Sequence, residues 1–327
     1  MKYFLSSGLV ILLGLSLALW WGGLPALTLT VLLSVLEMAL SFDNAILNVS
    51  VLQRMDPIWQ KRFYTWGIFF AVFFTRLIFP LLIVAITTQL HLWEVIQLAI
   101  KAPSEYSLHL SKAHIAFSVF GGLFLWQVFC GFFFNPAKKI HWLGRLETLL
   151  AEIGQRKISL FLLPIGMLLI LQYIMPQDQQ KAVLLSGIAA IALFTLLHFL
   201  TYFLQQKKEK AVATGIVPFL YLEVLDTSFS LDGVISAFAI TTDLVILCIG
   251  LSIGAIFVRS ITLFLAERNV MKQFIYLEHG AYYAIGLLGL IMLSKHFIEV
   301  PGFLTGLSCF VLLVTSLVSS IRHHRTG

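Results

Sequence analysis

The sequence predicts an all-α, polytopic membrane protein with about ten transmembrane helices, and three observations support this fold class. The chain of 327 residues is 59% hydrophobic and only 12% charged, whereas a soluble domain has about 25% charged residues. Long apolar runs recur from one end to the other, and roughly 20 helical residues cross a bilayer core. The loops between these runs differ in basic charge. We therefore expect residues 1–327 to form a single transmembrane domain.

The apolar runs define the predicted spans. They cover residues 4–21, 25–50, 64–90, 113–134, 158–175, 182–204, 213–239, 243–265, 277–294 and 302–321. The first run lacks a clear small-residue cleavage site, so we expect a retained helix rather than a signal peptide.

Basic residues predict the orientation. With the N-terminus on one side of the membrane, that side receives 16 Lys and Arg residues and the other side receives 4. Cytoplasmic loops carry the excess of Lys and Arg, so both termini are expected in the cytoplasm, with the protein in the inner or plasma membrane of a bacterial cell. These loops account for the formal charge of +6 without a nucleic-acid partner. The three cysteines lie in apolar runs, which argues against a disulfide framework.

Two loops are long enough to have structure of their own. Residues 141–157 alternate apolar and charged side chains at helical spacing, which predicts an amphipathic helix on the inner membrane surface. Residues 91–106 are expected to form an external amphipathic or re-entrant segment.

An internal repeat is visible in the polar residues of the spans. The segment from Glu37 to Asn44 (EMALSFDN) aligns without gaps on the segment from Asp226 to Gly233 (DTSFSLDG). One arginine follows each copy in the next span, and one histidine follows in the span after that. Five spans separate the copies, and an odd offset inverts the second copy in the membrane. The predicted layout is therefore a first repeat (25–134), a basic amphipathic loop with two connecting spans (135–212), a second, inverted repeat (213–294), and a last span with a basic tail (295–327).

Helical geometry places the polar residues of each copy on a stripe, because positions i, i+4, i+7 and i+11 share a face. The first stripe is Glu37, Ser41, Asn44 and Asn48, and the second is Glu223, Asp226, Ser230 and Gly233. Both stripes offer oxygen ligands, which hard divalent cations such as Mn²⁺, Mg²⁺ and Ca²⁺ prefer. An intramembrane carboxylate costs about 2.5–3.5 kcal/mol on insertion scales, so a functional role is the default interpretation.

Two further aspartates, Asp43 and Asp232, lie about 240° round the helix from the first acid of their motif. Either the helix unwinds locally, so that these aspartates also turn inward, or they face another helix. In the second case they are expected to pair with Arg76 and Arg259 as structural bridges.

Three other polar residues have two interpretations each. His114 and His279 either pack as hydrogen-bonded histidines or act as ligands or proton relays. Asn48 either joins helices by hydrogen bonds or serves as a ligand.

These motifs resemble those of the TerC-like integral membrane proteins, the tellurite-resistance and manganese-exporter type. The resemblance is carried by Glu37-Met-Ala-Leu-Ser-Phe-Asp-Asn-Ala45, by the segment from Glu223 to Gly233, and by the trailing Ala-Phe-Ala-Ile-Thr241. It covers roughly residues 25–295. It implies a secondary transporter that exports Mn²⁺, or Ca²⁺, through Glu37, Asp43, Asn44, Asp226 and Asp232. Two departures bear on ion preference: Gly233 stands where the family usually has serine, and Val234 and Ile235 stand where a proline often follows.

Three classes of function fit the polar motifs. The first is cation export, with protons as a plausible exchange partner and without ATP, because no Gly-rich phosphate loop is visible. The second is an intramembrane acid/base enzyme of the aspartic protease kind, which the five mirrored carboxylates disfavour. The third is a membrane scaffold, which would not need mirrored carboxylates. We therefore expect a transporter and no enzymatic activity.

Overall fold

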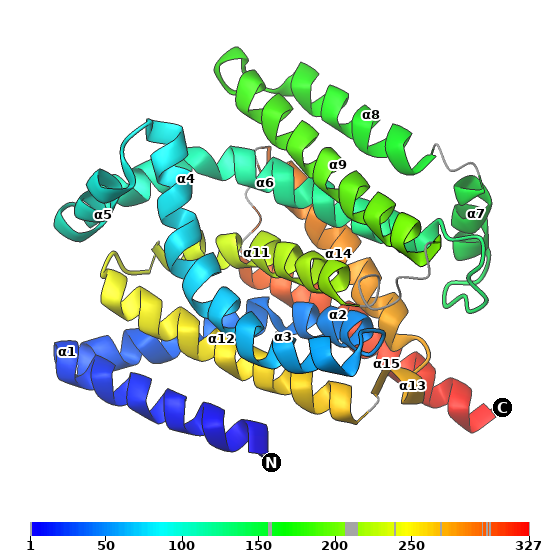
Figure 1. Ribbon diagram of the computed structural model, residues 1–327, viewed down its shortest axis with the longest axis horizontal. Helices are drawn as coiled ribbons and strands as arrows, with labels where there is room; N and C mark the ends of the chain where they lie inside the picture. The colour runs from blue at the N-terminus through cyan, green and yellow to red at the C-terminus, as the bar shows by residue number, and fades with distance from the viewer. Residues whose placement is uncertain are drawn as a thin grey trace. The chain divides into compact units, whose positions relative to one another are not determined.

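The chain forms two compact units, each assembled from two separate stretches of sequence. The structure, a computed structural model, describes residues 2–155, 159–206, 215–238, 240–268, 270–295, 297, 298, 300 and 302–326. Unit 1 comprises Met1–His114 and Phe219–Arg268, and unit 2 comprises Ile115–Pro218 and Asn269–Gly327. All the regular elements in the described residues are helices (Figure 1), which confirms the all-α class.

Unit 1 contains the elements that carry the two acidic motifs. Its helices are α1 (Lys2–Leu40), α2 (Phe42–Leu52), α3 (Pro57–Phe69), the π-helix η1 (Phe70–Ile78), α4 (Phe79–Thr88), α5 (Leu92–Lys101), the start of α6 (Pro103–Phe133), nearly all of α11 (Ile216–Phe238), and α12 (Leu244–Glu267).

Unit 2 contains the remaining elements. They are the rest of α6, α7 (Arg145–Gly154), α8 (Ser159–Ile174), α9 (Gln177–Gln206), the first residues of α11, α13 (Val270–Gln273), α14 (Leu277–Ser294) and α15 (Gly302–Thr326).

Six helices in the described residues are long and apolar enough to cross a membrane, so the predicted count of ten spans is not confirmed. They are Ser7–Leu40, Pro103–Phe133, Gln177–Thr201, Leu244–Glu267, Leu277–Ser294 and Leu304–His323, with shorter apolar helices at Phe74–Ile86 and Leu160–Ile174. The difference has physical causes. The first two predicted spans share α1, the predicted span 64–90 is divided among α3, η1 and α4, and α11 carries three carboxylates.

A kink divides α1 into two helical segments, residues 2–21 and 24–40. Gly22 and Gly23 have non-helical dihedral angles, and Gly23 has a φ of 67°, which glycine adopts without steric penalty. Pro25 follows, where the missing N–H of proline is tolerated in the first turn of the new segment. The kink lies in the gap between the predicted spans 4–21 and 25–50, and Figure 1 shows the chain doubling back there.

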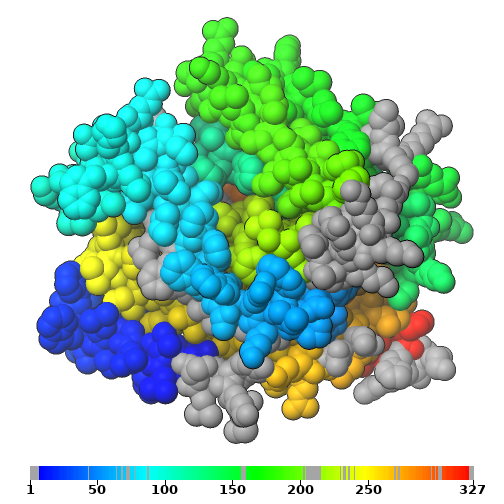
Figure 2. Space-filling view, viewed as in Figure 1, coloured from blue at the N-terminus to red at the C-terminus, as the bar shows by residue number. Residues whose placement is uncertain are grey.

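Both segments of α1 lie along α12. The first runs antiparallel to it, because Ser7 hydrogen-bonds Ser260 at one end and the Trp21 indole N–H donates to Asp243 at the other, at 3.1 Å. The second runs parallel to α12, with Ser34 donating to the Gly250 carbonyl at 3.0 Å. Figure 2 shows the surfaces of α1 and α12, in dark blue and yellow, as neighbours.

Small residues allow this close approach. A Cβ atom on Gly250 would lie 2.7 Å from the Leu33 Cβ atom, and one on Gly254 would lie 2.9 Å from the Ser34 carbonyl oxygen. The two glycines form a G-x-x-x-G pattern, a helix-packing motif in membrane proteins. This pattern is visible in the sequence, and it predicts that α12 packs closely against another helix.

The two predicted amphipathic segments are both helical. Segment 91–106 contains α5, which begins with the His91 N–H donating to the Glu94 carboxylate at 3.0 Å. Segment 141–157 contains α7, whose Glu147 is buried while Leu146, Leu149 and Ile153 are exposed. The apolar face of α7 therefore points away from the other helices of unit 2.

Gly254→Ala tests the packing of α12 on α1. The added Cβ atom would lie 2.6 Å from the Glu37 Cβ atom, so we expect overpacking to lower the free energy of unfolding by about 1–3 kcal/mol. Gly8→Ala is the matched control on α1, because a Cβ atom there meets nothing within 4 Å. Thermal unfolding of the purified protein in detergent measures both. Equal stability of the two variants would contradict the packing described.

Candidate functional site

The two acidic motifs meet inside unit 1, although they are far apart in sequence. Asn44, on α2, donates from Nδ2 to the Asp226 carboxylate on α11 at 2.5 Å, across 182 positions of the chain. Asn44 is buried and Asp226 is half-buried. The two motifs therefore contact each other through this pair.

The other ends of the motifs also lie together. Gly233 ends the second motif, and a Cβ atom there would lie 2.7 Å from the Glu37 Oε2 atom. The last residue of each aligned motif is therefore next to the first residue of the other. Contacts of this kind arise when two segments lie side by side in opposite directions.

The helix is interrupted in the first motif and continuous in the second. α1 ends at Leu40 and α2 begins at Phe42, with Ser41 at φ −107° and ψ 8° between them. The Ser41 hydroxyl donates to the Glu37 Oε1 atom at 2.8 Å. α11, in contrast, runs through the second motif without a break. A local distortion of the helix therefore occurs in one copy, two residues before Asp43, and the hydrogen bonds from the Ser41 N–H to the Glu37 carbonyl and from the Ala45 N–H to the Ser41 carbonyl are kept across it.

The buried glutamates of unit 1, Glu37 and Glu223, each lie beside an arginine of the same predicted repeat. Arg76 donates from Nη2 to the Glu37 Oε1 atom, and the two side chains are 4% and 1% exposed. The Arg259 Nη2 atom lies 3.5 Å from the Glu223 Oε1 atom. The predicted partners of the arginines were Asp43 and Asp232, whose side chains lie outside the described part of the structure. Within the described residues both arginines contact glutamates, and the pairing with Asp43 and Asp232 stays a prediction.

Aromatic rings and glycines complete the surroundings of the arginines. The Arg259 guanidinium carbon lies 3.7 Å from the centre of the buried Phe63 ring, a cation–π geometry. A side chain on Gly67 would overlap that guanidinium and lie 3.2 Å from the Glu223 Oε1 atom. The second ion pair therefore has room only because residue 67 has no Cβ atom.

A π-helix positions Arg76. η1 spans Phe70–Ile78, and Figure 1 shows the chain changing direction between α3 and α4, where η1 lies. π-helical turns are rare and recur at functional sites. Nothing in the apolar sequence of η1 distinguishes it from an α-helix, so sequence reasoning could not identify it.

A small polar cavity of about 20 Å³ lies between the two motifs. A water-sized occupant needs about 10–15 Å³ on this measure. Its lining combines residues of the first motif, the second motif and α12: Ser41, Asn48, Arg76, Asp226, Ala255, Val258, Arg259 and Thr262. Both predicted arginines and three predicted polar residues therefore share one cavity.

Several buried polar atoms near these motifs have no hydrogen-bond partner within the described residues. They are Asn48 Oδ1, Ser230 Oγ and both carboxylate oxygens of Glu223. Buried oxygens without donors are costly in an apolar interior, so a bound ligand that contacts them would stabilise this region. The predicted role of Asn48 as a ligand stays open, since its oxygen is free and it lines the cavity.

Clusters of three or more His, Cys, Asp or Glu side chains able to hold a metal ion do not occur among the described residues. A cation shell here would need amide and hydroxyl oxygens besides carboxylates. The predicted site residues Asp43 and Asp232 are not covered by this finding.

His279 lies in unit 2, in a second buried polar cluster that the sequence reasoning missed. Its Nε2 atom lies 2.9 Å from the Ile140 carbonyl oxygen and 3.5 Å from the Glu147 carboxylate. His114 lies at the end of the unit 1 part of α6 and is half-buried. The ligand and proton-relay roles predicted for these histidines remain predictions.

The centre of the second cluster is Glu147, on α7, which is fully buried. Lys138 donates to it at 2.8 Å, the Trp142 and Leu143 N–H groups donate at 3.2 and 3.3 Å, and the Tyr283 hydroxyl donates at 3.3 Å. Burial lowers the pKa of Lys138, an effect that the hydrogen bond to Glu147 opposes. The cluster fastens α7 and the preceding loop to α14.

Comparison with known proteins shows the family of the chain. Residues 42–327 match the model of a family described as a protein of unknown function, DUF475. The match covers most of the chain, so the chain belongs to the DUF475 family. Glu37 and Ser41 lie just before the matched range.

A curated relative is named as a membrane protein. An uncharacterized membrane protein of Rickettsia bellii is 22% identical over 120 residues, which are 37% of this chain and 39% of that protein. The chain thus matches less than half of that relative's length. No solved structure matches. The relative and the six apolar helices together identify the chain as a membrane protein.

The Glu37–Arg76 pair predicts a specific pattern of stabilities. Arg76→Gln leaves a buried carboxylate without its cationic partner, and we expect the free energy of unfolding to fall by about 3–5 kcal/mol. The double variant Glu37→Gln/Arg76→Gln removes both charges, so its loss should be smaller than the sum of the two single losses. Denaturant unfolding in detergent measures all three variants. Additive losses would show that the two side chains do not interact.

Glu147→Gln tests the second cluster. The change leaves Lys138 buried beside a neutral side chain, and we expect a loss of about 3 kcal/mol in the free energy of unfolding. Glu152→Gln is the control on the same helix, because Glu152 is exposed. Limited proteolysis of the loop 135–144 provides a second readout, and cleavage should accelerate only in Glu147→Gln. Equal behaviour of the two variants would rule out an anchoring role.

Proposed function

We propose that the chain is a TerC-like secondary transporter that exports a hard divalent cation from the cytoplasm. Mn²⁺ is the first candidate, and Ca²⁺ and Mg²⁺ fit the same oxygen chemistry. The observation that carries the proposal is the meeting of the two acidic motifs, where Asn44 donates to Asp226 and Asp226 lines a small polar cavity together with Ser41 of the first motif.

An inverted repeat, with the ten spans and cytoplasmic termini predicted from the sequence, accounts for this meeting. The reciprocal placement of Asn44 beside Asp226 and of Gly233 beside Glu37 supports it. The division into units supports it as well. The first two spans of each predicted repeat belong to unit 1 and the third to unit 2, so equivalent parts of the two copies fall together.

The ion pairs divide the carboxylates into two groups. Arg76 and Arg259 compensate the charges of Glu37 and Glu223, which lets these glutamates be buried at low cost. The cation then binds to Asp226, Asp43 and Asp232 together with the neutral oxygens of Ser41, Asn44 and Asn48. The glutamates join this set of ligands when their arginines move away. While Arg259 is paired with Glu223, its guanidinium also stacks on the Phe63 ring.

Proton exchange follows from the same chemistry. A cluster of aspartates that releases a divalent cation inside the membrane repels itself, and protonation relieves that repulsion. Protons entering as the cation leaves would thus reset the site. The enzyme alternative needs two carboxylates that share one proton, whereas Glu37 and Glu223 each lie beside an arginine.

Asp226→Asn tests the proposal. The substitution removes one charged ligand and keeps the size of the side chain, so we expect Mn²⁺ binding to weaken by about tenfold or more, equivalent to about 1.4 kcal/mol. Calorimetry in detergent measures binding, and uptake of radioactive Mn²⁺ into inside-out vesicles, with and without a pH gradient and with competing Ca²⁺, measures transport. Asp178→Asn is the control, because Asp178 is exposed.

Normal Mn²⁺ binding and transport by Asp226→Asn would show that Asp226 is not part of the cation site. Cleavage of a single-span peptide by the wild-type protein, prevented by Asp226→Asn, would instead support an intramembrane enzyme.

A further inference from the structure

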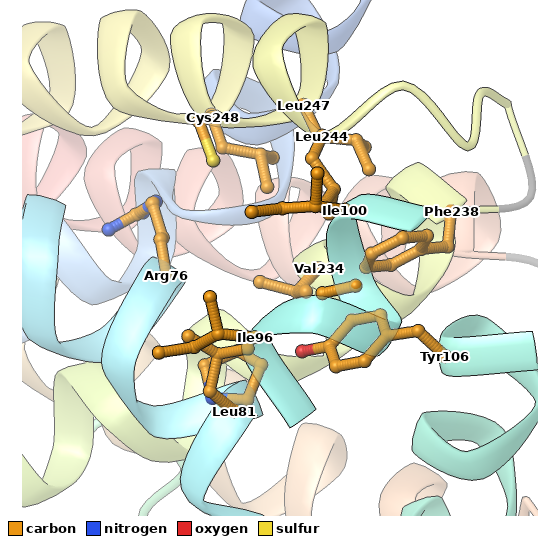
Figure 3. Close-up of a pocket in the computed structure, with 13 residues that line it drawn as sticks. Arg76, Leu81, Ile96, Ile100, Tyr106, Val234, Phe238, Leu244, Leu247 and Cys248 are labelled. Carbon is orange, nitrogen blue, oxygen red and sulfur yellow. The ribbon is translucent and has the colours of Figure 1, made fainter. Parts of the chain in front are cut away.

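A second, larger cavity of unit 1 lies beside the polar one and plays no part in the chemistry described so far. It has a volume of about 120 Å³, and Figure 3 shows its lining. Nearly all of the lining is apolar side chains from α4, α5, α11 and α12, such as Leu81, Ile96, Val234 and Leu247. The Tyr106 hydroxyl and the Cys248 thiol also face it.

Arg76 forms a wall common to both cavities, since its side chain lines each of them. In Figure 3 the guanidinium nitrogen atoms point away from the apolar side chains of the larger cavity. They point instead to Glu37, with which Arg76 pairs. Movement of the Arg76 side chain away from Glu37 would therefore change the wall that the two cavities share.

The larger cavity lies toward one end of the helices of unit 1. Its lining includes residues of α5, the start of α6, the end of α11 and the start of α12. The Lys and Arg bias of the loops assigns residues 91–112 and 240–242, which flank these elements, to the side opposite the termini. The polar cavity, in contrast, is lined by residues farther along α12, up to Thr262.

We propose that the apolar cavity is the non-cytoplasmic passage to the polar site, closed by Arg76, and that a small hydrated cation crosses it. The assignment rests on the proposed function for the identity of the solute. An apolar passage of this size stays dry and impedes an ion until it is hydrated. Opening needs two events, hydration of the cavity and release of Arg76 from Glu37. Export would take place in this direction, because the polar site receives the cation from the cytoplasm.

The test follows access to the polar cavity and requires no metal. In a full-length protein with Cys130, Cys248 and Cys309 changed to alanine, Asn48→Cys places one thiol at the polar cavity. Its rate of modification by aminoethyl methanethiosulfonate, a small cationic thiol reagent applied from the non-cytoplasmic side of vesicles, is then measured. Leu81→Trp fills the apolar cavity, and we expect it to slow the modification by about tenfold or more.

Ile86→Trp is the matched control, because it makes the same change in size on the same helix at an exposed position outside the cavity. It should leave the rate unchanged. Ala99→Phe fills the cavity from α5 and serves as a second block if Leu81→Trp does not yield a monodisperse protein. Retaining Cys248 as the only cysteine reports arrival of the reagent in the apolar cavity itself.

An unchanged rate with the cavity filled would overturn the passage, as would equal slowing by Ile86→Trp. These outcomes are separate from those of the proposed function. Slow modification in Leu81→Trp together with normal Mn²⁺ transport by Asp226→Asn would keep the passage and remove the cation site. An unchanged modification rate in Leu81→Trp, together with transport that depends on Asp226, would support the cation site and contradict the passage.

Discussion

The pairing of buried glutamates with buried arginines is the interaction on which the rest of unit 1 depends. An isolated carboxylate among apolar helices is destabilising by several kcal/mol, and so is an isolated guanidinium. Together, Glu37 with Arg76 and Glu223 with Arg259 are tolerable, provided that the helices carrying them stay in contact. The ion pairs therefore fix which helices are neighbours, and they leave the shorter aspartate side chains for other partners.

The less regular features of unit 1 follow from this requirement. Gly254 and Gly67 leave room for a charged side chain of a neighbouring helix, because a Cβ atom at either position would overlap it. The π-helix η1 changes the direction of the chain between α3 and α4 beside the Glu37–Arg76 pair (Figure 1), and Ser41, which hydrogen-bonds Glu37, separates α1 from α2. The second pair differs, because α11 and α12, which carry Glu223 and Arg259, are continuous helices.

Much of this could be predicted from the sequence, and the rest could not for physical reasons. Composition and apolar runs predict the helical membrane class. An inverted repeat would bring the two acidic motifs together, and the contact of Asn44 with Asp226 is consistent with that prediction. The contacts of Arg76 and Arg259 with Glu37 and Glu223 were not predicted, because helical periodicity gives the face of a residue and not the helix opposite. The span count was not confirmed for another reason: hydropathy does not register the change of helix type in η1, which divides the predicted span 64–90. The cluster around Glu147 was missed because its members are dispersed over three segments.

Gly233 has a consequence for how this chain differs from proteins with a serine in that place. The Glu37 carboxylate occupies the volume that a side chain at position 233 would need, so the two positions share a fixed space. A serine at 233 would therefore require the end of the Glu37 side chain to take another position. In this chain glycine lets the Glu37 carboxylate lie directly against the backbone of α11.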